Sequence, residues 1–273
     1  MKQEYSFFNQ KIHFININSF RIARIVLLFP LALLRLILVF LISLFWATTG
    51  LIQLNLYGFS RKLQNRIMQL WGKSIIFICG IVISRNRIPV NGHFILMPNH
   101  RGYHDIFIIA AYTPAAFIGK AELKRWPVIK QGFKLTNSIF VDRSNLHSLI
   151  SAMNKIKKSV ENGIPVAIFP EGTTYRGPFT GPFKKGSFKI AADTGIAVIP
   201  MAIHYNDEKD CWVGNDTFIG HFFRQLSKPV TRITVRYGSP LINKDYNNLM
   251  TETRMQIDNM LEDMIAEKQD KSA

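Results

Sequence analysis

The sequence predicts an α/β fold with a mixed, largely parallel central sheet flanked by helices, behind an N-terminal apolar helical membrane element. Three observations support this prediction. Short apolar runs alternate with helix-like segments after residue 75. These runs are continuously apolar rather than alternating, which is typical of strands that helices cover on both faces. The N-terminal part instead holds two long uncharged runs.

The N-terminal runs cover residues 25–34 and 36–60, with Arg35 between them. The second run is long enough to cross a bilayer core, which takes about 20 residues. Basic residues flank both sides, so the positive-inside rule does not orient a single span. Thr48, Thr49 and Gly50 near the middle suit a helical hairpin lying partly in one leaflet. A spanning helix and a half-buried hairpin both stay open, and a buried core helix ranks third because the run is so long.

Seven apolar runs are expected as strands: 75–83, 94–98, 115–119, 138–142, 165–169, 197–203 and 231–237. Six helices are expected near residues 104–112, 125–134, 147–161, 185–194, 217–226 and 246–268. The last helix is amphipathic, with an apolar stripe from Ile257 to Ile265. We therefore expect an N-terminal membrane-associating element over residues 1–73 and a catalytic domain with a C-terminal amphipathic helix over residues 74–273.

The composition indicates an anionic partner. The net charge is +16, and between Glu4 and Asp105 there are eleven Lys and Arg but no acidic residue. A segment both cationic and apolar favours an anionic membrane surface. No nucleic-acid motif occurs, and the cations flank apolar runs instead of forming one stripe, so we expect no nucleic-acid partner. Two distant cysteines, Cys79 and Cys211, exclude a disulfide framework and favour a reducing cytoplasmic setting.

The stretch "PNHRGYHD", residues 98–105, is the first candidate site. His100 and His104 have the i, i+4 spacing of zinc ligands on a helix. However, Arg101 stands where the H-E-x-x-H pattern has its general-base Glu, and Pro98 and Gly102 disfavour a helix through both histidines. We therefore expect no metal, and a metal-dependent hydrolase using the two histidines is the less favoured alternative.

An acid–base pair explains the same stretch better. His100 and Asp105 can meet if His100 lies in the turn after strand 94–98 and Asp105 in the first helical turn. A plain helix-start carboxylate, favoured by the helix dipole, is the alternative for Asp105. A histidine oriented by a carboxylate is a general base. Because no G-x-S-x-G nucleophile elbow occurs, this base would activate a hydroxyl of the substrate, which is the chemistry of acyl transfer to an alcohol.

Three further polar clusters follow predicted strands: "GKAELKRWP", "SIFVDRS" and "VAIFPEGTTYRGPF". Sites in α/β sheets gather at the carboxyl ends of strands. Arg143 can bind a phosphate with two hydrogen bonds, although a local pair with Asp142 is the alternative. Gly172 allows close backbone approach to a ligand. Glu171 could equally be a turn residue that accepts backbone N–H bonds.

These motifs, together with "VIPMAI" at 198–203 and "PFKKGSFKIA" at 182–191, resemble those of the glycerolipid acyltransferase family, specifically the 1-acylglycerol-3-phosphate acyltransferases. The resemblance covers roughly residues 75–240. It implies that His100 is the general base and Asp105 its orienting carboxylate. It also implies that Lys120 and Arg143 bind the acceptor's phosphate and that Glu171 and Gly172 lie against its glycerol. Thr173 and Arg176 are expected among the substrate-binding residues as well.

One position departs from the family pattern. Many members carry arginine directly after E-G-T, whereas this chain has Thr174 there and Arg176 two residues later. Lysophosphatidate is therefore the leading acceptor, and another lysolipid is the alternative. The resemblance implies no cofactor, a donor that is acyl-CoA or acyl carrier protein, and a location at the inner (cytoplasmic) membrane with the catalytic domain on the cytoplasmic side. Backbone N–H groups of the turn at 100–104 are candidates for stabilising the oxyanion.

Overall fold

The computed structural model describes residues 2–89, 92–125, 127–142, 144–214 and 216–270. Its centre is a seven-stranded sheet in the order β1-β7-β6-β2-β5-β3-β4. All neighbouring strands are parallel except β6 and β7. The predicted mixed, largely parallel sheet is thus confirmed. The strands are β1 (Ile81–Arg85), β2 (Ile95–Pro98), β3 (Ala116–Lys120), β4 (Ile139–Val141), β5 (Val166–Ala167), β6 (Val198–Tyr205) and β7 (Thr231–Tyr237).

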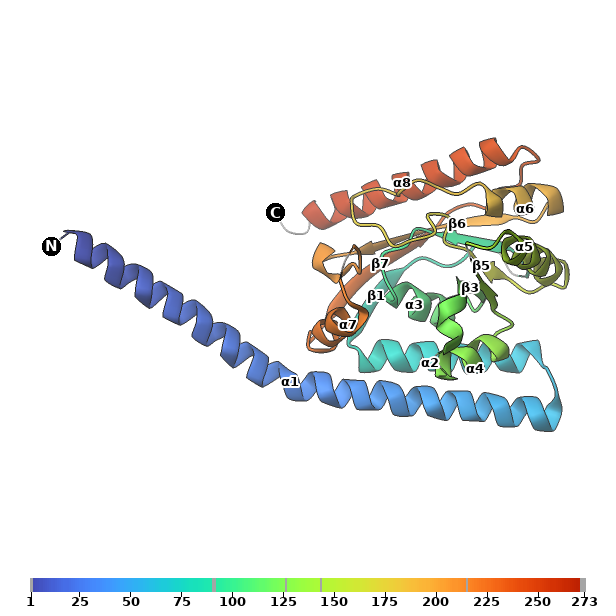
Figure 1. The fold of residues 1–273 in the computed structure, drawn as a ribbon. Helices are drawn as coiled ribbons and strands as arrows, with labels where there is room; N and C mark the ends of the chain where they lie inside the picture. The colour runs from blue at the N-terminus through green and yellow to red at the C-terminus, as the bar shows by residue number, and fades with distance from the viewer. Residues whose placement is uncertain (1, 90–91, 126, 143, 215, 271–273) are drawn as a thin grey trace.

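Helices cover both faces of this sheet, with α6 and α8 on one side and α1, α2 and α3 on the other (Figure 1). Buried apolar side chains fill the space on each side. The helices are α1 (Lys2–Tyr57), α2 (Arg61–Ile78), α3 (His104–Tyr112), α4 (Pro127–Leu135), α5 (Leu146–Glu161), α6 (Gly186–Thr194), α7 (Phe218–Leu226) and α8 (Tyr246–Asp270), with 3₁₀ turns η1 (Ala121–Arg125) and η2 (Glu208–Asp210).

The N-terminal hairpin turns at residues 58–60, so the predicted turn at 48–50 is wrong. The Thr49 hydroxyl donates a hydrogen bond to the carbonyl of Phe45, which lets a threonine stay inside the helix. Gly50 lies against Leu135 of α4, so closely that a Cβ atom there would displace the leucine side chain. α1 and α2 then run side by side in opposite directions (Figure 1), while the first half of α1 extends away from the domain.

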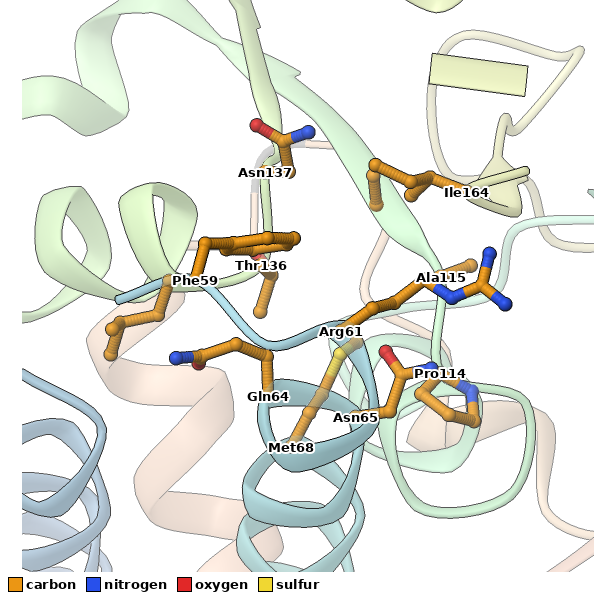
Figure 2. A pocket seen from close by; sticks show the side chains of 12 residues that line it. Phe59, Arg61, Gln64, Asn65, Met68, Pro114, Ala115, Thr136, Asn137 and Ile164 are labelled. Carbon is orange, nitrogen blue, oxygen red and sulfur yellow. The ribbon is translucent and has the colours of Figure 1, made fainter. Parts of the chain in front are cut away.

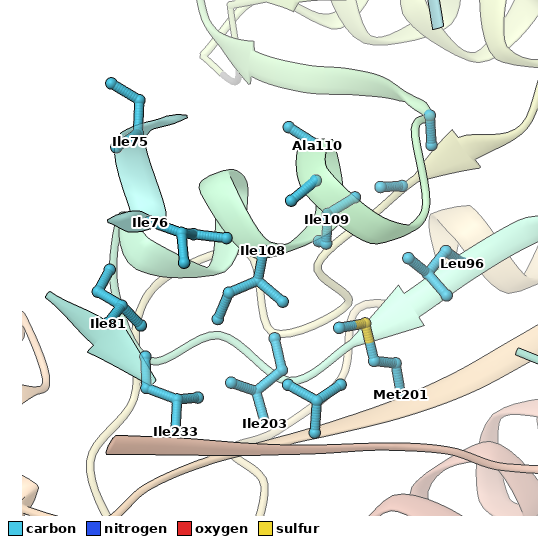
Figure 3. Close-up of a cluster of buried hydrophobic side chains, with 14 of the residues drawn as sticks. Ile75, Ile76, Ile81, Leu96, Ile108, Ile109, Ala110, Met201, Ile203 and Ile233 are labelled. Carbon is cyan, nitrogen blue, oxygen red and sulfur yellow. The ribbon is translucent and has the colours of Figure 1, made fainter. Parts of the chain in front are cut away.

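The predicted strand at 75–83 is also wrong in its first half, because α2 continues to Ile78 and β1 begins at Ile81. Ile76 points from α2 toward Ile108 of α3 (Figure 3), and Ile75 belongs to the same buried cluster. A short apolar run alone does not distinguish a buried strand from the end of a buried helix. Residue 74, the predicted start of the catalytic domain, therefore lies inside a helix whose buried side belongs to the main core.

The bounds of the remaining elements agree with the sequence prediction to within a few residues. β7 and α3 begin and end at the predicted residues. The apolar stripe of α8 is buried where expected, with Ile257, Leu261 and Met264 packed on Ala202 of β6. Since β2, β3, β4, β5 and β6 are mutually parallel, the loops after them meet at one edge of the sheet. That edge carries the candidate site.

Candidate active site

His100 and Asp105 form a hydrogen-bonded pair at the carboxyl end of β2. The His100 Nδ1 atom lies 2.7 Å from Asp105 Oδ2. β2 ends at Pro98, the chain turns through residues 99–103, and α3 begins at His104, so the aspartate is in the first helical turn. The carboxylate is fully buried, whereas the imidazole side chain keeps 19% of its surface exposed. The pair therefore has a protected carboxylate and an imidazole that a substrate can reach.

Three more donors hold the Asp105 carboxylate. Oδ2 accepts the backbone N–H groups of Arg101 at 2.7 Å and Gly102 at 3.0 Å, and Oδ1 accepts the Tyr205 hydroxyl at 2.7 Å. With these donors directed at it, the carboxylate acts as an acceptor toward the imidazole as well. The His100 proton therefore belongs on Nδ1, which leaves the Nε2 lone pair to accept a proton from elsewhere.

Glu171 joins the turn at residues 99–103 to the loop between β5 and α6. Its Oε2 atom accepts the backbone N–H of His100 at 2.6 Å, and Oε1 accepts that of Gly181 at 2.7 Å. Burial raises the pKa of this carboxyl group, while these two hydrogen bonds act in the opposite direction. Glu171 thus accepts hydrogen bonds from backbone amides, as the alternative interpretation of the sequence expects. Its predicted contact with the acceptor's glycerol stays a prediction. Phe169, two residues earlier, stacks on the His100 ring with centroids 3.9 Å apart.

The other predicted binding residues lie at the same edge of the sheet. Gly172 has the positive φ of 72° that favours glycine. Thr173 and Arg176 are exposed, and Arg176 donates to the carbonyl of Cys211 at 3.4 Å. Lys120 is exposed at the end of β3, two strands from β2, which corresponds to about 10 Å. Arg143 lies outside the described residues.

His104 is a buried histidine in an aromatic setting. Its ring contacts those of Tyr103 and Tyr205, and its Nδ1 atom has no hydrogen-bond partner. Burial lowers its pKa to about 4. Within the described part of the chain, no group of three or more His, Cys, Asp or Glu side chains could hold a metal ion.

Sequence reasoning missed two residues that support the turn at residues 99–103. Arg101 is 2% exposed and donates its guanidinium N–H groups to the carbonyls of Tyr175 and Phe179. Tyr205 bonds Asp105 from a position 100 residues away, so no local pattern could reveal it. The prediction that backbone N–H groups of this turn stabilise the oxyanion is wrong for residues 100–102. Their N–H groups already donate to Glu171 and Asp105 and are not available to an oxyanion.

Two hollows are found in the described structure. The pocket in Figure 2 is lined partly by α2 and partly by residues that come just before strands, among them Pro114 and Ile164, so it lies at the opposite edge of the sheet. A second cavity of about 250 Å³ lies between the end of β6 and the end of α8, lined by Arg101, His204 and Lys268 among others. Neither contains His100, Asp105 or Glu171 in its lining.

Known proteins share both the sequence pattern and the fold. Residues 81–204 match the family model described as "Acyltransferase". The chain is 30% identical over 150 residues to a 1-acyl-sn-glycerol-3-phosphate acyltransferase of Neisseria gonorrhoeae, covering 54% of this chain and 58% of that protein. It is 29% identical over 133 residues to a lyso-ornithine lipid O-acyltransferase of Pseudomonas aeruginosa, covering 47% and 51% of the two chains. The matches thus span between half and three fifths of these relatives' lengths.

A solved structure has the same fold over nearly the whole chain. The crystal structure of the 1-acyl-sn-glycerophosphate (LPA) acyltransferase PlsC from Thermotoga maritima superposes with a TM-score of 0.70 at 22% identity, covering 89% of this chain and 98% of that one. The family match covers residues 81–204, which is 124 of the 273 residues. Over this region the chain is similar to the acyltransferase family, and it has the fold of the Thermotoga maritima structure.

Proposed function

We propose that the chain is a membrane-associated O-acyltransferase. It moves a fatty acyl group from an acyl thioester, on coenzyme A or acyl carrier protein, to the free hydroxyl of 1-acyl-sn-glycerol-3-phosphate. The single observation that carries the proposal is the pairing of His100 Nδ1 with the buried Asp105 carboxylate at 2.7 Å, with the imidazole partly exposed. The family match and the relatives' names support the same chemistry.

In the proposed mechanism, His100 Nε2 takes the proton of the lysolipid hydroxyl as its oxygen attacks the thioester carbonyl carbon. A new C–O bond forms, the C–S bond breaks and the thiolate leaves. Because a free thiol has a pKa of about 8.5, the thiolate needs little assistance as a leaving group. One general base is therefore sufficient, and neither a covalent enzyme intermediate nor a cofactor is required.

A second acceptor is favoured by a specific observation. Residue 174, directly after Glu171-Gly172-Thr173, is threonine rather than a cation. Relatives named lyso-ornithine lipid O-acyltransferase match this chain at an identity similar to that of relatives named for the phosphate acceptor. Another lysolipid, of which lyso-ornithine lipid is the example, is thus the alternative acceptor for the same reaction.

The N-terminal helices support a membrane location. Residues Leu28–Tyr57 of α1 are long and apolar enough to cross a membrane, and only 11% of the most apolar window is buried inside the protein. A core helix would be mostly buried, so we place this surface in lipid, as a half-buried hairpin with α2. Cys79 and Cys211 are both unpaired. This supports a reducing compartment, and hence the cytoplasmic side of the inner membrane.

The test is an assay of the purified full-length protein with both donor types and a panel of lysolipids, with and without a chelator. His100→Ala should lower kcat by at least about 10²-fold, the contribution expected of a general base. Membrane association should be unchanged. His147→Ala is the matched control, because His147 is an exposed histidine on α5. Near-normal turnover by His100→Ala would refute the mechanism, and activity abolished by the chelator would favour the hydrolase alternative.

A further inference from the structure

Lys184 lies directly over the Glu171-Gly172-Thr173 turn. A Cβ atom built on Gly172 would lie 2.9 Å from both Cε and Nζ of Lys184, so the lysine side chain fills the space that the missing side chain leaves. The backbone N–H of Lys184 donates to the carbonyl of Pro170 at 2.8 Å. The backbone of Lys184 is therefore bonded to this turn, and its side chain lies against Gly172. Glycine at 172 is favoured by its positive φ, and a larger residue there would also displace the end of the Lys184 side chain.

The turn under Lys184 is bonded to the catalytic histidine. Glu171, adjacent to Gly172, accepts the backbone N–H of His100 at 2.6 Å. Both oxygens of Glu171 accept backbone N–H bonds, and the ion pairs of the described residues do not join Glu171 to Lys184. The side chain of Lys184 is exposed, and the ion pairs found among the described residues do not include it. Its ammonium group thus faces solvent beside the site with its charge available.

The other nearby cations of the described chain are less suited to meet a substrate. Arg101 is buried and already donates to two carbonyl groups. Arg176 is directed to the carbonyl of Cys211. Lys120 lies two strands from β2. Thr174 has no charge. Lys184 is therefore the cation that the described structure places on the turn bonded to His100.

We propose that Lys184 binds the anionic headgroup of the lysolipid acceptor and holds its free hydroxyl toward His100. This rests on the proposed function and names a residue for its acceptor site. The ammonium group is a point charge with three donors, which suits a phosphate monoester or a carboxylate equally. The headgroup is therefore the phosphate if the acceptor is 1-acyl-sn-glycerol-3-phosphate, and the carboxylate if it is lyso-ornithine lipid.

The experiment compares Lys184→Met, Lys184→Arg and Lys185→Met in the full-length protein, using both acceptors. Methionine keeps an unbranched side chain over Gly172 but removes the charge. Lys185→Met removes one charge from the next residue, which is also exposed, so it controls for net charge. Lys184→Met should raise the KM for the acceptor by about tenfold or more, as expected when a charged hydrogen bond is lost. The KM for the acyl donor and the thermal unfolding midpoint should stay unchanged, and Lys184→Arg should restore most of the acceptor affinity.

The possible results separate this inference from the proposed function. A wild-type protein that transfers acyl groups to neither acceptor refutes the proposed function. If the wild type is active and Lys184→Met behaves like Lys185→Met, the role of Lys184 alone is refuted. A rise in the KM for the donor rather than the acceptor refutes it as well. The acceptor for which the wild type has the higher kcat/KM identifies the headgroup.

Discussion

His104 lies one position before Asp105 in the chain but in a different chemical environment. Its side chain is surrounded by aromatic rings, and its Nδ1 atom has no hydrogen-bond partner. Burial disfavours the charged imidazolium, which lowers its pKa from 6.5 to about 4. The folded protein therefore keeps this histidine neutral at pH values at which the unfolded chain already binds a proton.

This difference predicts acid sensitivity. Below pH 6.5 the unfolded chain binds a proton that the folded chain takes up only near pH 4, so the contribution of His104 to stability is complete above pH 6.5 and is lost as the pH falls toward 4. His104→Leu should reduce the drop in the unfolding midpoint between pH 7 and pH 5, measured by thermal unfolding in detergent. His147→Leu, at an exposed site, should leave that drop unchanged. An identical pH dependence in wild type and His104→Leu would contradict the prediction.

The pairing of His100 with Asp105 could be predicted because it is local. Five positions in a strand–turn–helix context determine that the two side chains can meet. The groups that hold the pair in place could not be predicted, since Tyr205 and Gly181 come from distant segments that only the assembled sheet brings near. Glu171 was identified by its motif, but whether it faces a substrate or two backbone amides depends on loop geometry, which a sequence pattern does not contain.

At the scale of elements, one arginine attaches α1 to the end of α7. Arg35 interrupts the apolar N-terminal runs, and its guanidinium donates to the carbonyls of Leu226, Lys228 and Pro229, where α7 ends. A cation at a helix C-terminus is favoured by the exposed carbonyl groups there. Gly80 makes room for this contact, because a Cβ atom at that position would lie 2.6 Å from Arg35 Nη2. The sequence shows the interruption but not the partner, which is 191 residues away.

Removing the hydrogen bonds of Arg35 should lower the stability of the domain but leave its membrane binding unchanged. We expect Arg35→Met to lower the free energy of unfolding by about 1–3 kcal/mol, the range for losing hydrogen bonds to a charged group. Arg66→Met is the control, since Arg66 is an exposed arginine on α2. Chemical unfolding in detergent measures the difference, and vesicle binding of both variants should match the wild type. Equal stability of the two variants would show that the contact has no energetic role.

The strand boundary near residue 80 and the place of the hairpin turn could not be predicted, for a related physical reason. The sequence predicts helix ends and strand starts well where glycine, proline or polar residues separate apolar runs. The run at 75–83 has only Gly80 as a separator, and α2 and β1 are both apolar there. The hairpin turn was expected at Gly50, but that glycine serves close packing against α4, and Gly58 with φ 70° begins the turn instead. The sequence alone does not show whether a glycine permits close packing or a turn with positive φ.

For the whole molecule, the position of α1 relates the site to the lipid surface. Two hydrogen bonds, from Trp46 to Ser74 and from Trp71 to Ser43, join α1 to α2, and α2 packs on α3. The second half of α1 therefore lies along the domain rather than leading away from it (Figure 1). It carries large exposed apolar side chains: Leu34, Ile37, Phe40, Leu41, Phe45 and Ile52. Such a surface suits a helix that lies in the interface.

This arrangement predicts that both ends of α1 are on the same side of the membrane. Single cysteines at Asn9, in the first half of α1, at Lys62, just after the hairpin turn, and at Ile242, on the domain surface, can be labelled in sealed vesicles with a membrane-impermeant maleimide. Cys79 and Cys211 are buried, so the background labelling should be low. If α1 lies in one leaflet, all three sites react from the same side, because the chain returns to the surface from which it entered. A spanning α1 would instead place position 9 alone on the opposite side of the membrane. If the cysteine at position 9 is labelled only from that opposite side, α1 crosses the membrane and the half-buried arrangement is refuted.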